Sequence, residues 1–128
     1  MNVVIRVDAS VEIGSGHVIR CLTLAKQLKR HSMNVTFICR DEEGNYIDFL
    51  KEQGMNVISF SINEAKNSKD NFIMDANETI KIIEMLDKVH LLIVDHYEFD
   101  ENWEAMLRPY VNKIIVIDDL ANRRQDRK

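Results

Sequence analysis

The chain has 128 residues, of which 45% are hydrophobic, so we expect a single domain with one buried core. Its 17 Lys and Arg residues against 21 Asp and Glu residues give a net charge of −4, which argues against a nucleic-acid partner. No apolar run approaches the ~20 residues of a membrane span. The N-terminus begins directly with a strand pattern and lacks signal-peptide features, so we expect a cytoplasmic protein.

The first predicted elements are a buried parallel strand over residues 3–7 and a helix that begins near His17. The helix is indicated by apolar residues at helical spacing: Val18, Cys21, Leu22, Ala25 and Leu28. Between them, Gly14, Ser15 and Gly16 lie where the strand turns into the helix. The unpaired N–H groups and positive dipole of a helix N-terminus favour an anion or polar ligand beside His17. The alternative is a tight connection with an exposed His17, because the third glycine of a dinucleotide fingerprint is replaced by Ile19.

The middle of the chain continues the alternation. Strands are predicted over residues 34–39 and 55–60, with a short helix over about 45–53 that Gly54 ends in the left-handed conformation. Residues 61–74 are mostly polar and predict a mobile surface connection with at most one helical turn. A solvated loop is favoured there over a lid.

The second half repeats the pattern. Asp75, with Glu78 three residues later, predicts a helix N-cap. The helix that follows has a predicted buried stripe of Ile80, Ile83, Met85, Leu86 and Val89. A buried strand over 91–94, a helix over 101–108 capped by Asp100 and stopped by Pro109, and a strand over 113–117 complete the domain. We place the domain at 1–119, followed by a charged tail or linker start at 120–128.

This alternation predicts an α/β fold: a three-layer, Rossmann-like domain with a five-stranded parallel sheet in the order 3-2-1-4-5. Ligands of such sheets bind beyond the carboxyl ends of the strands, where the strand order reverses. His17 and the corner Asp95-His96-Tyr97 are therefore expected at one crevice. Asp95 and Asp118 are predicted to cap loops or helices, whereas His96 and Tyr97 either pack or line the site.

Arg20 and the two cysteines complete the candidate groups. Arg20 either shares a helical face with His17, where it binds a phosphate or a sugar hydroxyl, or pairs with Asp8. Cys21 and Cys39 lie in apolar stretches and predict buried free thiols. His17 and Cys21 are four residues apart, but no further metal ligand is evident, so we expect neither a metal nor a cofactor.

Three segments resemble one known family. They are Arg6-x-Asp8-x5-Gly14-x-Gly16-His17-x2-Arg20, then Asp95-His96-Tyr97 with Trp103-Glu104, and finally the segment from Val116 to Arg123 with its Asp-Asp-Leu-Ala. Together they resemble the nucleotide-sugar hydrolases of pseudaminic acid biosynthesis, whose relatives include spore-coat polysaccharide biosynthesis proteins. That family has the two-domain GT-B fold. Gln125 and Arg127 depart from its pattern, which has a His and a Cys there.

The resemblance implies that the chain is the N-terminal domain of an enzyme that hydrolyses a UDP-linked amino sugar and releases UDP. His17 would be the general base, and the substrate would contact Gly14, Ser15, Gly16, Arg20, His96 and Tyr97. A second domain, or a separate partner, would hold most of the nucleotide. The surface around Gly14, Tyr97 and Asp119 would meet that domain or pair in a homodimer.

Two other functional hypotheses stay open: the chain is a non-catalytic carbohydrate-binding module, or it is the N-terminal half of a nucleotide-sugar glycosyltransferase. A receiver-type signalling domain is set aside. Its strand 3 would need to end in a phosphorylatable Asp and its strand 5 in a Lys, but here they end in Ser59-Phe60 and Asp118-Asp119.

Overall fold

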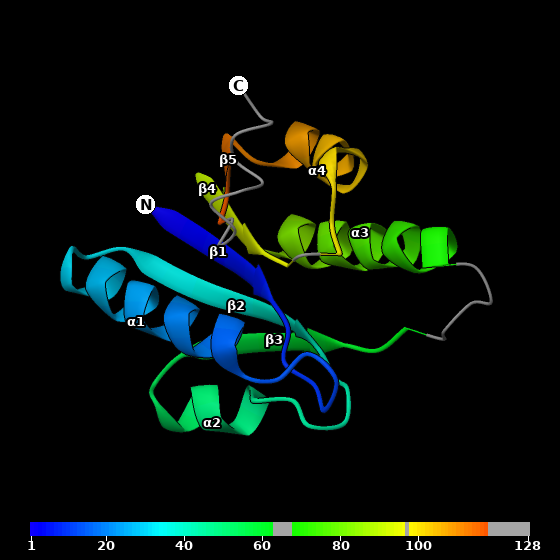
Figure 1. Ribbon diagram of the computed structural model, residues 1–128. Coiled ribbons are helices and arrows are strands. Elements are labelled where there is room, and N and C mark those ends of the chain that lie inside the picture. Colours follow the sequence, from blue (N-terminus) through cyan, green and yellow to red (C-terminus); the bar gives the residue numbers. More distant parts are fainter. Residues whose placement is uncertain (63–67, 97, 118–128) are drawn as a thin grey trace, which may run out of the picture.

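The computed structural model describes residues 1–62, 68–96 and 98–117, and strands and helices alternate along almost all of them (Figure 1). Their bounds are β1 Asn2–Val7, α1 Gly16–Arg30, β2 Asn34–Arg40, α2 Ile47–Glu52, β3 Asn56–Phe60, α3 Ser68–Met85, β4 Leu91–Asp95, α4 Glu101–Leu107, a 3₁₀ turn Arg108–Tyr110 and β5 Lys113–Val116. None of the helices in these ranges is long and apolar enough to cross a membrane.

The five strands form one parallel sheet in the order β3-β2-β1-β4-β5, which confirms the predicted fold class and strand order. In this register Ile5 of β1 lies between Phe37 of β2 and Ile93 of β4. Helices α1 and α2 cover one face and α3 and α4 the other, so the domain has three layers (Figure 1). The reversal of strand order falls between β1 and β4, as the sequence predicted.

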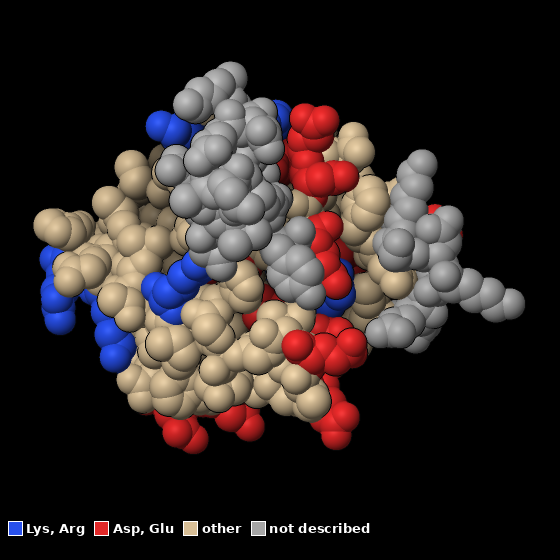
Figure 2. Space-filling model, viewed as in Figure 1, with Lys and Arg blue, Asp and Glu red and all other residues tan. Residues whose placement is uncertain are grey.

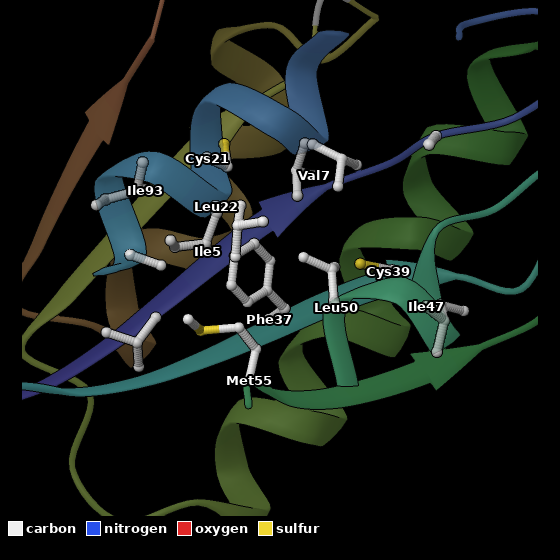
Figure 3. Packing of buried hydrophobic residues seen from close by; sticks show 14 of the residues in the cluster. Ile5, Val7, Cys21, Leu22, Phe37, Cys39, Ile47, Leu50, Met55 and Ile93 are labelled. Atoms are coloured by element: carbon white, nitrogen blue, oxygen red, sulfur yellow. The ribbon is translucent and has the colours of Figure 1, made fainter. Parts of the chain in front are cut away.

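Alternation along β1 divides the core into two halves. Ile5 and Val7 point toward α1 and α2, where Phe37, Leu22 and Leu50 pack with them (Figure 3). On the other face, Val4 packs with residues under α3 and α4, among them Trp103, Leu92 and Leu107. Arg6 also points to this second face, and its burial there is complete. A charged side chain in that position requires buried partners, which are described below.

Most of the predicted element ends are confirmed. Gly54 follows α2 with φ of +84°, and Asp100 caps α4 by accepting hydrogen bonds from the backbone nitrogens of Asn102 (2.9 Å) and Trp103 (3.3 Å).

The prediction for the two cysteines is also confirmed: Cys21 and Cys39 are buried free thiols. Burial raises the pKa of Cys39 to about 12, so this thiol stays protonated at neutral pH.

The start of α3 corrects the predicted loop over 61–74. The helix begins at Ser68, and Phe72 packs against the second half of the core, so this polar stretch does have a residue to bury. Asp75 is therefore not an N-cap but an interior residue of α3 that is fully buried. Met85 was expected in the buried stripe, yet it is 77% exposed. The prediction of a solvated loop rather than a lid over 63–67 lies outside the described residues.

Gly44 gives a testable difference between two glycines of similar backbone conformation. Gly44 has φ of +83°, and a Cβ there would lie 2.6 Å from the backbone nitrogen of Val11. Gly54 has φ of +84°, but a Cβ there would meet nothing within 4 Å. We expect Gly54→Ala to cost ~1–2 kcal/mol for its left-handed backbone. Gly44→Ala should cost ~1–3 kcal/mol more, because two loops must move apart. Urea unfolding measures both, and equal losses would contradict the close packing.

Candidate functional site

The loop between β1 and α1 is held by its own short hydrogen bonds. The Gly14 backbone nitrogen donates to the Ser10 carbonyl oxygen at 2.8 Å, and the Ser10 Oγ accepts from the Ile13 nitrogen at 3.0 Å. Gly14 has φ of +80°, which glycine adopts without steric cost. A Cβ at Gly16 would meet nothing within 4 Å, so the backbone at the start of α1 lies next to open space. The loop ends at Gly16, the first residue of α1, so His17 lies in the first turn of that helix.

His17, Arg20 and Asp95 form a compact polar cluster between the start of α1 and the end of β4. The His17 Nδ1 lies 2.6 Å from Asp95 Oδ1. Arg20 donates from Nε to Asp95 Oδ2 at 2.6 Å and from Nη2 to Asp95 Oδ1 at 2.5 Å. The Asp95 side chain is 1% exposed, whereas those of His17 and Arg20 are 18% and 33% exposed. The cluster therefore has a buried carboxylate behind an imidazole and a guanidinium that reach the surface.

Asp95 is ionised in this cluster. Burial raises its pKa, but the hydrogen bonds from Arg20 and His17, together with the charge of Arg20, outweigh that effect and hold the pKa of Asp95 below its usual range. The Cys21 Sγ donates to Asp95 Oδ2 at 3.4 Å, and burial, together with the charge of Asp95, raises the pKa of this thiol. Cys21 is thus a protonated donor to the carboxylate. The prediction that Asp95 caps a loop or a helix is wrong, because its side chain contacts α1 instead.

A second cluster lies on the opposite face of the sheet, under α3 and α4. Arg6 donates to both oxygens of Asp8, at 2.6 and 3.0 Å, and also contacts both oxygens of Asp75, with Nε to Oδ1 at 3.2 Å. Arg40 donates from Nε to Asp75 Oδ2 at 2.7 Å and from its backbone nitrogen to Asp8 Oδ1 at 2.7 Å. Two buried carboxylates are thereby balanced by two guanidinium groups. Asp8 pairs with Arg6 rather than with Arg20, which settles that alternative.

His96 belongs to this second cluster. Its Nε2 lies 2.9 Å from Asp8 Oδ2, and its ring stacks on Phe99 with a centroid distance of 3.9 Å. Phe99 stacks in turn on Trp103 at 4.5 Å. Asp95 and His96 are neighbours in the chain, so strand alternation sends their side chains to opposite faces of the sheet. His96 therefore packs and pairs, while Asp95 faces His17.

A cavity of about 310 Å³ lies on the β2 side of the same loop. It is lined largely by polar and acidic residues, including Ser10, Glu12, Arg40, Asp41, Glu42 and Glu43. Figure 2 shows Asp and Glu side chains over the region where Figure 1 places the β1–α1 and β2–α2 loops. Burial and the charge of Asp8 raise the pKa of Glu42, whose buried Oε1 has no hydrogen-bond partner among the described residues. Such a lining disfavours a diphosphate.

The structure brings some of the predicted site residues together and leaves others apart. The structure brings His17 and Arg20 together at the reversal of strand order, next to Gly16 and Ser15. Tyr97, Asp118 and Asp119 lie outside the described residues. The roles of Asp95 and Asp75 were missed. For Asp95, the available signal is its position at the end of a buried strand, next to His96. For Asp75, no local sequence pattern indicates that it pairs with Arg6. Within the described ranges, no group of three side chains has the arrangement of a metal site.

Comparison with known proteins gives two distant relatives, and no family model matches the chain. Over 120 residues the chain is 33% identical to the UDP-2,4-diacetamido-2,4,6-trideoxy-beta-L-altropyranose hydrolase of Campylobacter jejuni, covering 93% of this chain and 37% of that protein. Over 119 residues it is 29% identical to an uncharacterized protein of Methanocaldococcus jannaschii, covering 93% of this chain and 22% of that protein. The chain, which spans well under half the length of either relative, is therefore similar over nearly all of its own length to part of a UDP-sugar hydrolase.

Proposed function

We propose that the chain is the N-terminal domain of a UDP-amino-sugar hydrolase of surface or spore-coat polysaccharide biosynthesis, in which His17 is the general base. The observation that carries the proposal is the position of His17. It stands at the start of α1 where the strand order reverses, with Nδ1 2.6 Å from the buried Asp95 carboxylate. The similarity to the Campylobacter hydrolase supplies the substrate class.

The reaction follows from an imidazole that can accept a proton. His17 takes a proton from a water molecule, and the water oxygen attacks the anomeric carbon of the sugar. The bond between that carbon and the diphosphate oxygen breaks, and UDP leaves with the electron pair. General-base catalysis of this kind is worth ~10²–10⁴-fold, so the remaining rate enhancement must come from binding and orientation of the substrate.

Binding roles are assigned to the groups around His17. Ser15 and Gly16 offer backbone N–H groups near the positive end of the α1 dipole, which suits a phosphate or a sugar oxygen. The N–H of Gly14 already donates to the Ser10 carbonyl oxygen, so Gly14 is proposed to contribute by letting the backbone come close to the substrate. Arg20 is 33% exposed on its side chain and adds a positive charge at the same edge. Tyr97 completes the proposed set of direct contacts. His96, whose Nε2 lies 2.9 Å from Asp8 on the opposite face of the sheet, is proposed to contribute only indirectly, by holding the Asp8 carboxylate.

The nucleotide is proposed to bind mainly to a second domain, as in a GT-B fold, or to a separate partner. This chain covers 37% of the Campylobacter hydrolase, which leaves room for such a domain. We also propose that the face around Gly14 meets that domain, or a second copy of the chain in its absence. The acidic cavity on the β2 side of the loop supports the assignment of UDP to another domain.

The affinity of the isolated chain for UDP tests this division of roles. We expect weak binding, because the base and most phosphate contacts would belong to the second domain. Isothermal titration calorimetry of the 128-residue chain with UDP measures it. A dissociation constant in the low micromolar range would contradict the proposal.

The function itself is tested in a fusion of this chain to the part of the Campylobacter hydrolase that follows the aligned segment. The fusion is given the UDP-diacetamido sugar named for that enzyme, and UDP release into water is measured. Release without any added acceptor supports a hydrolase, whereas release only with an acceptor sugar supports the glycosyltransferase alternative. A folded fusion that binds the sugar and releases no UDP under either condition would support the carbohydrate-binding module.

A further inference from the structure

The Asp95 carboxylate accepts four contacts, and all of them come from one turn of α1. Oδ1 faces the His17 Nδ1 at 2.6 Å and the Arg20 Nη2 at 2.5 Å. Oδ2 faces the Arg20 Nε at 2.6 Å and the Cys21 Sγ at 3.4 Å. Each oxygen therefore has two neighbours on α1. The Asp95 side chain itself is 1% exposed, so water does not compete for these positions.

We propose that Asp95, held by Arg20 and Cys21, is the positioning residue that fixes His17 in the tautomer with its proton on Nδ1. This inference rests on the proposed function, in which the other ring nitrogen, Nε2, accepts the proton from water. A carboxylate accepts hydrogen bonds and donates none, so the 2.6 Å contact requires the hydrogen to be on Nδ1. The lone pair of the neutral ring then lies on Nε2.

Arg20 prevents the carboxylate from turning away from His17. Its Nε and Nη2 contact different oxygens of Asp95, a two-point arrangement that a lysine cannot reproduce. Arg20 Nη2 also lies 3.2 Å from His17 Nδ1. Since a guanidinium only donates, and since the 2.6 Å contact to Asp95 is much shorter, the carboxylate decides where the ring proton lies.

The geometry predicts that asparagine cannot replace Asp95. If the amide nitrogen took the place of Oδ2, it would face the Arg20 Nε and Cys21 Sγ donors. If it took the place of Oδ1, it would face the Arg20 Nη2, but it could donate to His17 Nδ1 once that nitrogen had lost its hydrogen. We therefore expect Asp95→Asn to adopt the second arrangement and to move the His17 proton to Nε2.

The test is the tautomer of His17 in the 128-residue chain, read from long-range ¹H–¹⁵N correlations of the imidazole rings at about pH 8, where an ordinary histidine is neutral. His17 signals are assigned by their loss in His17→Asn. We expect the proton on Nδ1 in the parent chain and on Nε2 in Asp95→Asn. His90 is the internal reference: its Nδ1 lies 3.1 Å from the Asn2 backbone N–H, so its proton should be on Nε2 in both proteins.

The outcomes separate this inference from the proposed function. A parent His17 with its proton on Nε2 overturns the inference, and this measurement needs no variant. An unchanged His17 tautomer in a folded Asp95→Asn also overturns it.

In the fusion described above, Asp95→Asn should lower kcat ~10²-fold or more with a nearly constant KM. A parental kcat would overturn the positioning role. If His17→Ala keeps the parental rate while the tautomers are as expected, the proposed function fails and the tautomer assignment stands.

Discussion

Replacing His17 with alanine is expected to slow UDP release by ~10²-fold or more while leaving the affinity for UDP nearly unchanged. The reason is that His17 would act on water in the transition state, whereas UDP would be held by the second domain. Initial rates of UDP release in the fusion, over a range of sugar concentrations, separate kcat from KM.

His31 provides the matched control for this substitution. It lies at the opposite end of α1, as the residue after Arg30, and is exposed. His31→Ala removes the same side chain from the residue that ends the same helix, and it should leave kcat and KM at the parental values. Equal losses in binding and turnover for His17→Ala would make His17 a ligand-holding residue. A parental rate for His17→Ala would mean that the glycine loop is only a turn.

Replacing Asp75 with asparagine is expected to lower the free energy of unfolding by ~3–5 kcal/mol. The Asp75 carboxylate accepts from Arg6, from Arg40 Nε at 2.7 Å, from Trp103 Nε1 at 3.1 Å and from Thr79 Oγ1 at 3.2 Å. An amide has one acceptor oxygen, and its N–H groups would face donors. Arg6, which is fully buried, would also lose half of its compensating charge. Urea unfolding followed by circular dichroism measures the loss.

Glu78→Gln on the same helix is the control, because its ion pair with Lys81 is exposed. The Lys81 Nζ to Glu78 Oε2 distance is 2.9 Å, but 68% of the Lys81 side chain is exposed. Such a pair contributes ~0.2–1 kcal/mol, so this variant should unfold close to the parent. A loss below ~1 kcal/mol for Asp75→Asn would contradict the importance of the buried cluster.

The pH dependence gives the same prediction a second check. Burial raises the pKa of Asp75, but the charge of Arg6 and its hydrogen bonds, with the charge of Arg40, outweigh this and lower the pKa. A carboxyl with a lowered folded-state pKa contributes stability that is fully present above its unfolded pKa, ~3.9, and is lost as the pH falls through the folded value. The difference in stability between the parent and Asp75→Asn should therefore be largest near neutral pH and shrink below about pH 4.

The layers and the strand order of this protein follow from local sequence patterns. Apolar runs such as 91–94 and helical spacing from Val18 onward are short-range signals, and alternation of the two leads to a parallel sheet with a reversal between β1 and β4. The position of His17 at that reversal follows as well, because a strand-to-helix loop leaves the sheet at its carboxyl edge. These features need no knowledge of which side chains meet across the fold.

Which charges pair was decided only by the tertiary structure. Asp75 binds Arg6 across 69 positions of the chain, and Asp95 binds His17 across 78. The polar stretch before Asp75 gave no local signal for the start of α3, because the helix there is stabilised by packing of Phe72 and by the buried ion pairs of Asp75. Local patterns determine which face of an element is apolar, but the partner of a buried charge depends on the register and packing of distant elements.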